Sequence, residues 1–348
     1  MEYRAALHTL KPYSVEEDDW SIKLDANESP YNVPPLVRER IMNRLDYLAF
    51  NRYPEMGMQD LRTQIAGEFR LSMDNVLLGS GSSELLATLC YTFGGPGRGI
   101  VFPVPSFSMY AIYAQISDSV SVPVELNEDY SFPKEKMLQA AKENNGKLII
   151  ICNPNNPTGT VTSLDDIEYV VSRAECPVVV DEAYYEFHGE SAVHLLGKYK
   201  NLIVARTFSK AYALASARVG YMMADCSLTA LIAKAQMPYH VNALSLAAAE
   251  VVYQMKDEFM PLIRQIIEER NRLAVTLTAM EGITVFPSSA NFLLIKTEKA
   301  AEIGAYLRGK AVAVRDFSKA PYLENCIRIT VGSPQENELL VKYIADCI

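Results

Sequence analysis

The sequence predicts an α/β fold: a large domain with a mainly parallel sheet between layers of helices, followed by a smaller α+β domain. Short, wholly apolar segments alternate with segments of helical spacing through most of the first 245 residues, which is typical of parallel sheets buried on both faces. After about residue 245 a long helical stretch leads into short strands separated by helices. We therefore expect an N-terminal arm with a short helix over 1–45 that packs on the small domain, a large domain over 46–245 and a small domain over 246–348.

Apolar runs and turn residues place the individual elements. In chain order we expect a helix at 58–70, strand-turn-helix units at 75–93 and 99–116, strands at 147–152, 176–181 and 201–207, and a helix at 164–174. The C-terminal third is expected to hold the long helical stretch, 244–280, and short strands within 283–297, 312–317 and 326–332. Ligands of parallel sheets bind at the carboxyl ends of the strands, so the polar residues after each strand are the candidate site residues.

Composition and charge exclude several classes of function. The chain has 348 residues with 33 Lys and Arg against 42 Asp and Glu, a net charge of −9, which argues against a general nucleic-acid or anionic-membrane binder. We expect no signal peptide and no membrane span, because no suitable apolar run is present. Six scattered cysteines and four histidines without metal-ligand spacing favour free thiols in a cytoplasmic protein, with neither a disulfide framework nor a metal site.

Polar residues after four of the expected strands fit an anionic ligand. Ser82 and Ser83 follow Gly81 at the start of an expected helix, where backbone N–H groups and hydroxyls bind phosphate well. Thr207, Ser209 and Arg218 add hydroxyl donors and a countercharge after another strand. Each of these groups alone is an ordinary helix cap or surface residue.

The remaining strand-end residues specify the ligand further. Asp181 can hold a positively charged ring nitrogen, Asn153 and Tyr184 can donate to a ring oxygen, and Lys210 can form a Schiff base with an aldehyde. A phosphate, a pyridine nitrogen, a phenolic oxygen and an aldehyde together describe pyridoxal 5′-phosphate. The strand ends therefore predict a site for this cofactor.

The same stretches resemble a known family. The chain resembles the fold-type I pyridoxal-phosphate aminotransferases, and within them the histidinol-phosphate aminotransferase group. The matching segments are "LDANESP" (24–30), "NRYPEM" (51–56), "GSGSSE" (79–84), "PSFSMY" (105–110), "CNPNNPTG" (152–159), "DEAYYEF" (181–187), "RTFSKAYALASARVGY" (206–221), "NFLLI" (291–295), "VRDF" (314–317) and "RITVG" (328–332).

The resemblance implies a role for each candidate residue. Lys210 is expected to carry the cofactor and to act in catalysis with Asp181 and Tyr184. The resemblance assigns the ring oxygen to Asn153 and Tyr184, the cofactor phosphate to Ser82, Ser83, Thr207, Ser209 and Arg218, and a ring face to Phe107. Arg328 is expected to bind a substrate carboxylate, with Tyr13, Asn27 and Arg315 nearby, and Tyr53 is expected to reach the cofactor phosphate of the partner in a homodimer.

The resemblance also implies a reaction, to which alternatives stay open. It implies ping-pong transfer of the amino group of L-histidinol phosphate to 2-oxoglutarate through Lys210, giving imidazole acetol phosphate and L-glutamate in histidine biosynthesis. An aromatic amino-acid aminotransferase or a threonine-phosphate decarboxylase-like enzyme shares the same cofactor motifs. The chain departs from the group at Ser216-Ala217, at Ser82-Ser83 and in the helix after residue 332, which lacks an arginine. A non-catalytic ligand-sensing domain is disfavoured by the negative charge and by the start of the chain at the arm.

Overall fold

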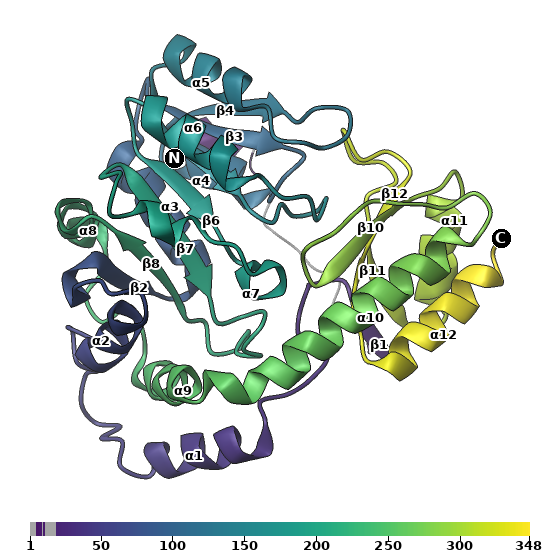
Figure 1. Cartoon of the computed structure of the whole chain (residues 1–348), viewed down its shortest axis with the longest axis horizontal. Coiled ribbons are helices and arrows are strands. Elements are labelled where there is room, and N and C mark those ends of the chain that lie inside the picture. Colours follow the sequence, from purple (N-terminus) through teal and green to yellow (C-terminus); the bar gives the residue numbers. More distant parts are fainter. Residues whose placement is uncertain (1–4, 9, 11–18) are drawn as a thin grey trace.

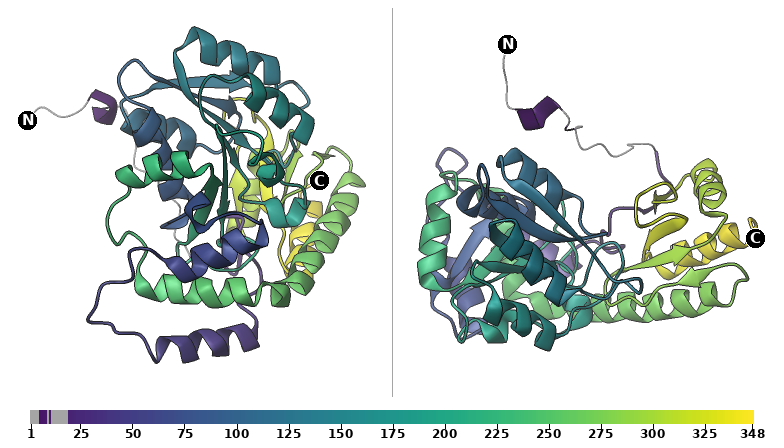
Figure 2. Two further views of the ribbon diagram at one scale, coloured as in Figure 1. Left: turned by 60° about the vertical axis from the view of Figure 1, so that its left-hand side comes forward. Right: turned by 90° about the horizontal axis from the view of Figure 1, so that it is seen from above.

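The computed structural model describes residues 5–8, 10 and 19–348, which form two lobes around two β-sheets (Figure 1). Figure 2 shows the lobes side by side when the molecule is seen from above. None of the helices in this described part of the chain is both long and apolar enough to cross a membrane.

The large lobe is built on a seven-stranded sheet in the order β2-β8-β7-β6-β5-β3-β4 within the described residues. Its strands are β2 (Val76–Gly79), β3 (Gly99–Val104), β4 (Val120–Glu125), β5 (Gly146–Cys152), β6 (Val178–Asp181), β7 (Leu202–Thr207) and β8 (Gly220–Ala224). Only β8 runs antiparallel to its neighbours β2 and β7; the other pairs are parallel. The carboxyl ends of β3, β5, β6 and β7 therefore lie along one edge, as the sequence predicts for a mainly parallel sheet.

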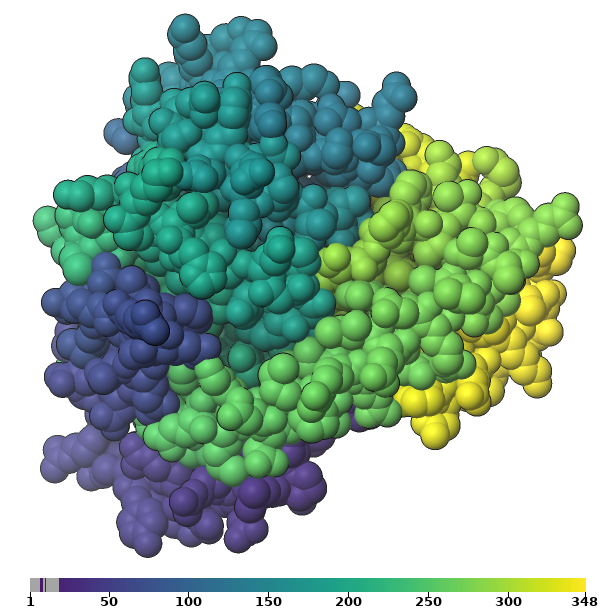
Figure 3. All heavy atoms as spheres, viewed as in Figure 1, coloured from purple at the N-terminus to yellow at the C-terminus, as the bar shows by residue number. Residues whose placement is uncertain are grey.

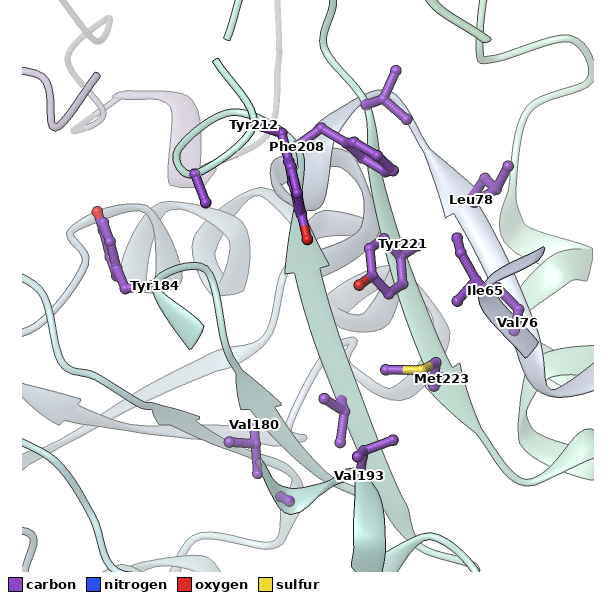
Figure 4. Packing of buried hydrophobic residues seen from close by; sticks show 14 of the residues in the cluster. Ile65, Val76, Leu78, Val180, Tyr184, Val193, Phe208, Tyr212, Tyr221 and Met223 are labelled. Atoms are coloured by element: carbon purple, nitrogen blue, oxygen red, sulfur yellow. The ribbon is translucent and has the colours of Figure 1, made fainter. Parts of the chain in front are cut away.

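Helices cover both faces of this sheet because its strands are apolar on both sides. Along β6, Val178 and Val180 join one buried cluster whereas Val179 joins the other. Figure 4 shows the first cluster, with Val180 on β6 and with Tyr221 and Met223 on β8, two strands that lie on either side of β7. The helices over this face are α2 (Gln59–Glu68), α5 (Lys134–Glu143), α6 (Leu164–Arg173), α7 (Tyr185–His188) and α9 (Ala243–Gln254), and those over the opposite face are α3 (Gly81–Phe93), α4 (Met109–Ile116) and α8 (Cys226–Ile232).

The small lobe is built on a five-stranded sheet in the order β1-β11-β12-β10-β9 within the described residues. Its elements are β1 (Ile22–Leu24), β9 (Thr284–Val285), β10 (Phe292–Lys296), β11 (Val312–Asp316), β12 (Cys326–Thr330), α10 (Met260–Thr278), α11 (Ala300–Gly309) and α12 (Pro334–Ala345). β1 comes from the N-terminal segment and pairs in parallel with β11, so this strand belongs to the sheet of the small lobe. The 3₁₀-helices are Ala5–His8, Met73–Asn75, Ala192–Leu195, Ala233–Ala235 and Lys256–Phe259.

The connection between the lobes differs from the sequence prediction. The expected helical stretch of 244–280 is two α-helices, α9 and α10. Pro261 has no N–H donor and is suited to the first turn of a helix, and α10 begins at Met260 after the 3₁₀ turn at Lys256–Phe259. α9 packs against α2 and against α1 (Pro35–Leu45), which places α9 with the large lobe rather than beyond a boundary at 245. α1 therefore packs with the large lobe and not, as expected, with the small lobe. α10 carries the chain from the large lobe to the small lobe (Figure 1), and the side chains of α10 bridge the two lobes on the face shown in Figure 3.

A buried ion pair under the sheet edge leads to a prediction about stability. Arg206 and Glu182 have side chains exposed by only 2% and 1%, and Arg206 Nε donates to Glu182 Oε2 over 2.9 Å. Arg206 Nη2 also donates to Ser191 Oγ, and the guanidinium lies 3.5 Å from the centre of the Tyr185 ring. Arg206→Ala would leave the Glu182 charge buried and unpaired, so we expect a loss of about 3–5 kcal/mol in unfolding free energy, seen as a lower thermal midpoint.

Arg173→Ala is the matched control for this variant. Arg173 is exposed, and its guanidinium also lies over a tyrosine ring, that of Tyr169 at 3.9 Å. Because that contact stays in solvent, we expect it to contribute about 1 kcal/mol or less. Equal thermal midpoints for the two variants would contradict the structural role of Arg206.

Candidate active site

A cavity of about 240 Å³ lies where the carboxyl ends of the parallel strands meet the small lobe. Residues of both lobes and of the segment after β1 contribute to its wall. The described lining consists of Asp25, Ala26, Asn27, Ser82, Ser83, Ser106, Phe107, Ser108, Cys152, Asn156, Pro157, Asp181, Ala183, Tyr184, Thr207, Ser209, Lys210, Arg218, Arg315, Phe317 and Arg328.

One end of the cavity is shaped for an anion. α3 begins at Gly81 directly after β2, and Gly81 has a φ of +78°, a conformation that side-chain-bearing residues rarely adopt. A Cβ at Gly81 would lie 2.6 Å from Arg218 Nη2, so the guanidinium sits directly against the helix N-terminus. Thr207 donates to Ser209 Oγ over 3.0 Å beside it. Helix N–H groups, hydroxyls and a guanidinium thus converge as a phosphate requires.

Lys210 lies in the loop after β7 and directs its amine toward the N-terminal segment. Lys210 Nζ donates to the carbonyl oxygen of Ala26 over 2.8 Å. Burial, with the positive charges of Arg328 and Arg218 as smaller contributions, lowers the pKa of this amine to about 8. With this pKa about one tenth of the amine is neutral, and nucleophilic, at pH 7, and about half at pH 8.

This lowered pKa predicts how the protein reacts with an aldehyde at different pH values. Only the neutral amine condenses with pyridoxal phosphate, so with a pKa of about 8 the reaction rate should rise about tenfold from pH 7 to pH 9 and then level off. An ordinary lysine, with a pKa near 10.4, would continue to accelerate through pH 10. Stopped-flow absorbance on protein stripped of cofactor measures this profile, and a rate that keeps rising through pH 10 would contradict the buried environment of Lys210.

Asp181 ends β6 and has two unequal carboxylate oxygens. Its Oδ2 accepts a hydrogen bond from the Tyr110 hydroxyl over 2.7 Å, whereas its buried Oδ1 has no hydrogen-bond partner among the described residues. Burial raises the pKa of this carboxyl to about 6, although the bond from Tyr110 acts in the opposite direction. A buried polar atom without a partner is rare in native proteins and commonly marks a missing ligand. The N–H of a protonated pyridine ring would satisfy Oδ1, so the residues present fit pyridoxal phosphate.

The cavity also carries positive charge on its small-lobe side. Arg315 and Arg328 are directly opposite each other on the antiparallel pair β11 and β12, and both line the cavity. Arg328 Nη1 donates to Asn156 Oδ1 over 2.6 Å, and its Nη2 donates to the carbonyl oxygen of Asp25. Like charges directly opposite on a sheet repel each other, so an anionic group between them would be stabilising.

Most of the residues predicted from the sequence meet in this cavity. They are Ser82, Ser83, Phe107, Asp181, Tyr184, Thr207, Ser209, Lys210, Arg218, Asn27, Arg315 and Arg328. Asn27 donates from Nδ2 to the Tyr184 hydroxyl oxygen over 2.8 Å, which fixes the position of that hydroxyl. Tyr184 keeps its own proton available for an acceptor in the cavity, because burial raises the pKa of its hydroxyl.

Two predicted residues, Asn153 and Tyr53, are absent from the described lining, and a third is not among the described residues. The described lining does not include Asn153, whose Oδ1 instead accepts from the backbone N–H of Thr162 over 2.8 Å; Asn156 of the same "NPNNPTG" loop lines the cavity in its place. Tyr53 is 78% exposed and stacks on Tyr239, with ring centroids 4.4 Å apart, and it is likewise absent from that lining. Tyr13 falls outside the described residues.

Further residues that the sequence patterns did not single out also shape the cavity. Asn156, Ser106, Ser108 and Phe317 line it, and Tyr110 holds Asp181 from behind. Tyr110 was detectable in principle, because it follows the predicted Phe107 by three residues at the start of a helix. Residues spaced in this way lie on the same side of a helical turn.

Comparisons with known proteins agree with this site. A family model described as "Aminotransferase class I and II" matches residues 21–344. The histidinol-phosphate aminotransferase of Caldanaerobacter subterraneus subsp. tengcongensis is 35% identical over 99% of this chain and 98% of its own. Histidinol-phosphate aminotransferase 1 of Carboxydothermus hydrogenoformans is 38% identical over the same shares.

A solved structure supports the fold in the same way. The histidinol-phosphate aminotransferase of Sinorhizobium meliloti, solved in complex with pyridoxal-5′-phosphate, matches with a TM-score of 0.90 over 99% of this chain and 98% of its own, at 23% identity. The fold and the resemblance expected from the sequence are thus confirmed. The chain belongs to the aminotransferase class I and II family.

Proposed function

We propose that this protein is a pyridoxal-phosphate-dependent aminotransferase that transfers the amino group of L-histidinol phosphate to 2-oxoglutarate. Relatives that carry the name histidinol-phosphate aminotransferase align over almost the whole of both chains, at 35% and 38% identity. The observation that carries the proposal is that one cavity joins the Lys210 amine, the unpartnered Oδ1 of Asp181 and a phosphate-shaped helix N-terminus. These three groups match the three recognised parts of the cofactor.

Different residues of the cavity would bind different parts of the cofactor. Asp181 would hold the ring nitrogen, Tyr184 and Asn156 the ring oxygen, and Lys210 the aldehyde carbon, while Phe107 would cover one face of the ring. The phosphate would be held by Ser82, Ser83, Thr207, Ser209 and Arg218. When bound, pyridoxal phosphate supplies a carbon that accepts amino groups and a ring that withdraws electrons from the substrate Cα.

The chain's own groups then move and hold protons. The neutral Lys210 amine, with its pKa lowered to about 8, would remove the proton from the substrate Cα and deliver it, as general acid, to the cofactor carbon that carried the aldehyde. Asp181 is an anion above its pKa of about 6 and keeps the proton on the ring nitrogen near neutral pH. Asn27 orients the Tyr184 hydroxyl toward its acceptor. Each group thus acts at one stated atom, as positioned catalysis requires.

The substrates would be selected on the small-lobe side. Arg328 would bind the carboxylate of the 2-oxo acid, and Arg315 directly opposite it would bring a second positive charge to the phosphate of the amino donor. A doubly charged phosphate relieves the repulsion between two facing guanidinium groups better than a neutral side chain does. This pairing favours a phosphorylated donor over an aromatic amino acid.

Steady-state kinetics with several donors tests the substrate. We expect kcat/KM to be highest for L-histidinol phosphate, and lower by about 10²-fold or more for L-histidinol and L-phenylalanine, which lack a charge-paired phosphate. Arg315→Gln should reduce kcat/KM for the phosphorylated donor much more than for L-histidinol. A preference for phenylalanine or tyrosine would identify an aromatic aminotransferase instead, and release of CO₂ from O-phospho-L-threonine would identify a decarboxylase.

We further propose that the working enzyme is a homodimer in which Tyr53 reaches the partner's cavity. Large exposed apolar side chains cluster in the segments before α2 and α9, where Tyr53 stacks on Tyr239. The exposed members are Tyr47, Phe50, Tyr53, Met56, Met237 and Tyr239. Apolar exposure on this scale marks an association surface.

Complementation between inactive variants tests this arrangement. Lys210→Ala and Tyr53→Ala chains are each expected to be impaired alone. If Tyr53 acts in trans, a mixed dimer regains one intact cavity, with Lys210 from one chain and Tyr53 from the other. Activity that never rises on unfolding and refolding the two variants together, although light scattering shows dimers, would contradict the trans role.

The cysteines support a proposal about location. All six are free in the structure, and Cys90, Cys152, Cys176 and Cys326 are buried. Free thiols persist in reducing compartments. We therefore place the reaction in the cytoplasm.

A further inference from the structure

Tyr110 lies behind the cavity in a position set by several contacts. Its side chain is fully buried, and its backbone N–H donates to the Phe107 carbonyl oxygen over 3.1 Å at the start of α4. Its ring meets the Phe107 ring edge-on, with centroids 5.5 Å apart and an interplanar angle of 85°. Tyr110 does not belong to the described cavity lining, so it acts on a ligand only through other residues.

The hydroxyl of Tyr110 makes the two oxygens of Asp181 unequal. It donates to Oδ2 over 2.7 Å, and Oδ1 is left as the oxygen without a partner among the described residues. Because a buried carboxylate needs compensating donors, this bond fixes the plane of the carboxylate. Burial raises the pKa of Tyr110 well above the ordinary value, so the hydroxyl keeps its proton and remains a donor.

We propose that Tyr110 is a positioning residue that holds Asp181 as an anion, with Oδ1 presented to the cofactor ring nitrogen, and that also supports the Phe107 ring. This inference rests on the proposed function, because it assumes that pyridoxal phosphate binds in this cavity. Asp181 and the ring nitrogen share one proton, and a hydrogen bond donated to the carboxylate favours the state in which the ring carries it. Without Tyr110 the proton shifts to Asp181, and the ring withdraws electrons less strongly.

The other titratable groups near Asp181 do not stabilise its anion as Tyr110 does. Cys152 is its register partner on β5, and burial raises the pKa of that thiol to about 12, so it carries no charge. Glu182 adds negative charge, which opposes ionisation of Asp181. The Tyr184 hydroxyl is bonded to Asn27, from which it accepts over 2.8 Å.

Tyr110→Phe tests the proposal, with Tyr253→Phe as the matched control. Tyr253 is also buried and its hydroxyl also donates to a carboxylate, that of Glu68, but neither residue lines the cavity. For Tyr110→Phe we expect kcat to fall about 10- to 100-fold, which corresponds to one hydrogen bond to a charged group, with little change in KM. Tyr253→Phe should leave kcat unchanged.

A spectroscopic measurement separates positioning from general structural damage. In protein loaded with pyridoxal phosphate isotope-labelled at the ring nitrogen, nitrogen NMR should report a protonated ring in wild type and Tyr253→Phe, and a less protonated ring in Tyr110→Phe. The same chemical shift in all three proteins would overturn the proposal. A wild-type protein that binds no pyridoxal phosphate would instead overturn the proposed function on which it rests.

A double-mutant cycle tests whether Tyr110 works through Asp181. The readout is the dissociation constant of pyridoxal phosphate from the stripped protein, which needs no turnover. Tyr110→Phe should weaken binding several-fold in wild type and by about twofold or less once Asp181 is asparagine, because residues that act together are not additive. Equal weakening in both backgrounds would show that Tyr110 does not act through the Asp181 charge.

Discussion

Lys210→Ala is expected to lower turnover by at least about 10⁴-fold, since it removes both the amine that binds the cofactor aldehyde and the general base. The variant should nevertheless fold. The pKa of Lys210 in the folded chain, about 8, lies below that of a free lysine, so the amine opposes folding at pH values below its unfolded pKa. Its loss should therefore leave the cofactor-free protein no less stable at pH 7, as judged by thermal unfolding.

Lys198→Ala provides the control for this experiment. Lys198 is exposed and pairs with Glu168 at 2.5 Å, and neither residue belongs to the described cavity lining. It should keep wild-type turnover. Appreciable transamination by Lys210→Ala, with full recovery of folded protein, would remove Lys210 from the centre of the mechanism.

Asp181→Ala is expected to have the second largest effect, a loss of roughly 10²–10⁴-fold in kcat. The variant lacks the anion whose unpartnered Oδ1 would hold the ring proton. Because the pKa of Asp181 is raised to about 6, its anion destabilises the folded chain above that pH. The cofactor-free variant should thus stay folded at pH 7 while failing in catalysis.

The protonation of the Asp181 carboxyl at low pH provides a second test of its role. As the pH falls through about 6 the carboxyl of the cofactor-free protein becomes protonated, so the affinity of the stripped wild type for pyridoxal phosphate should fall on the acid side, and this limb should disappear in Asp181→Asn. Asp74→Asn, a change of an aspartate whose side chain is 72% exposed, serves as control. Near-normal turnover by Asp181→Ala would contradict its proposed role at the ring nitrogen.

The strand-end residues could be predicted because a parallel sheet brings them together whatever the loops do. Asp181, Thr207 and Lys210 follow apolar strands whose carboxyl ends share an edge. The choice between Asn153 and Asn156 could not be made in this way. Both asparagines lie in one irregular loop, and only the loop's own hydrogen bonds, such as Thr162 N–H to Asn153, decide which one reaches the cavity.

Arg206 and Arg218 are both near Lys210 in the sequence, but they lie in different surroundings in the structure. Arg206 and Thr207 are consecutive on β7, so their side chains point to opposite faces of the sheet; Thr207 lines the cavity and Arg206 pairs with Glu182 in the core. Arg218 reaches the anion site from a loop. The alternation of side chains along β7 is enough to separate the roles of these two arginines.

The break between α9 and α10 could not be predicted in this way. It depends on a single proline, whose effect on a long helical pattern is not fixed in advance.

The most direct test of the proposed reaction is the half-reaction of the purified, cofactor-loaded protein with L-histidinol phosphate in the absence of any oxo acid. The proposal predicts rapid loss of the visible absorbance of the bound cofactor, followed by its return on addition of 2-oxoglutarate. Phenylalanine and tyrosine should act far more slowly. Absorbance that remains unchanged with L-histidinol phosphate but is lost with an aromatic amino acid would contradict the proposed substrate, and a protein that acquires no absorbance with pyridoxal phosphate would contradict the site itself.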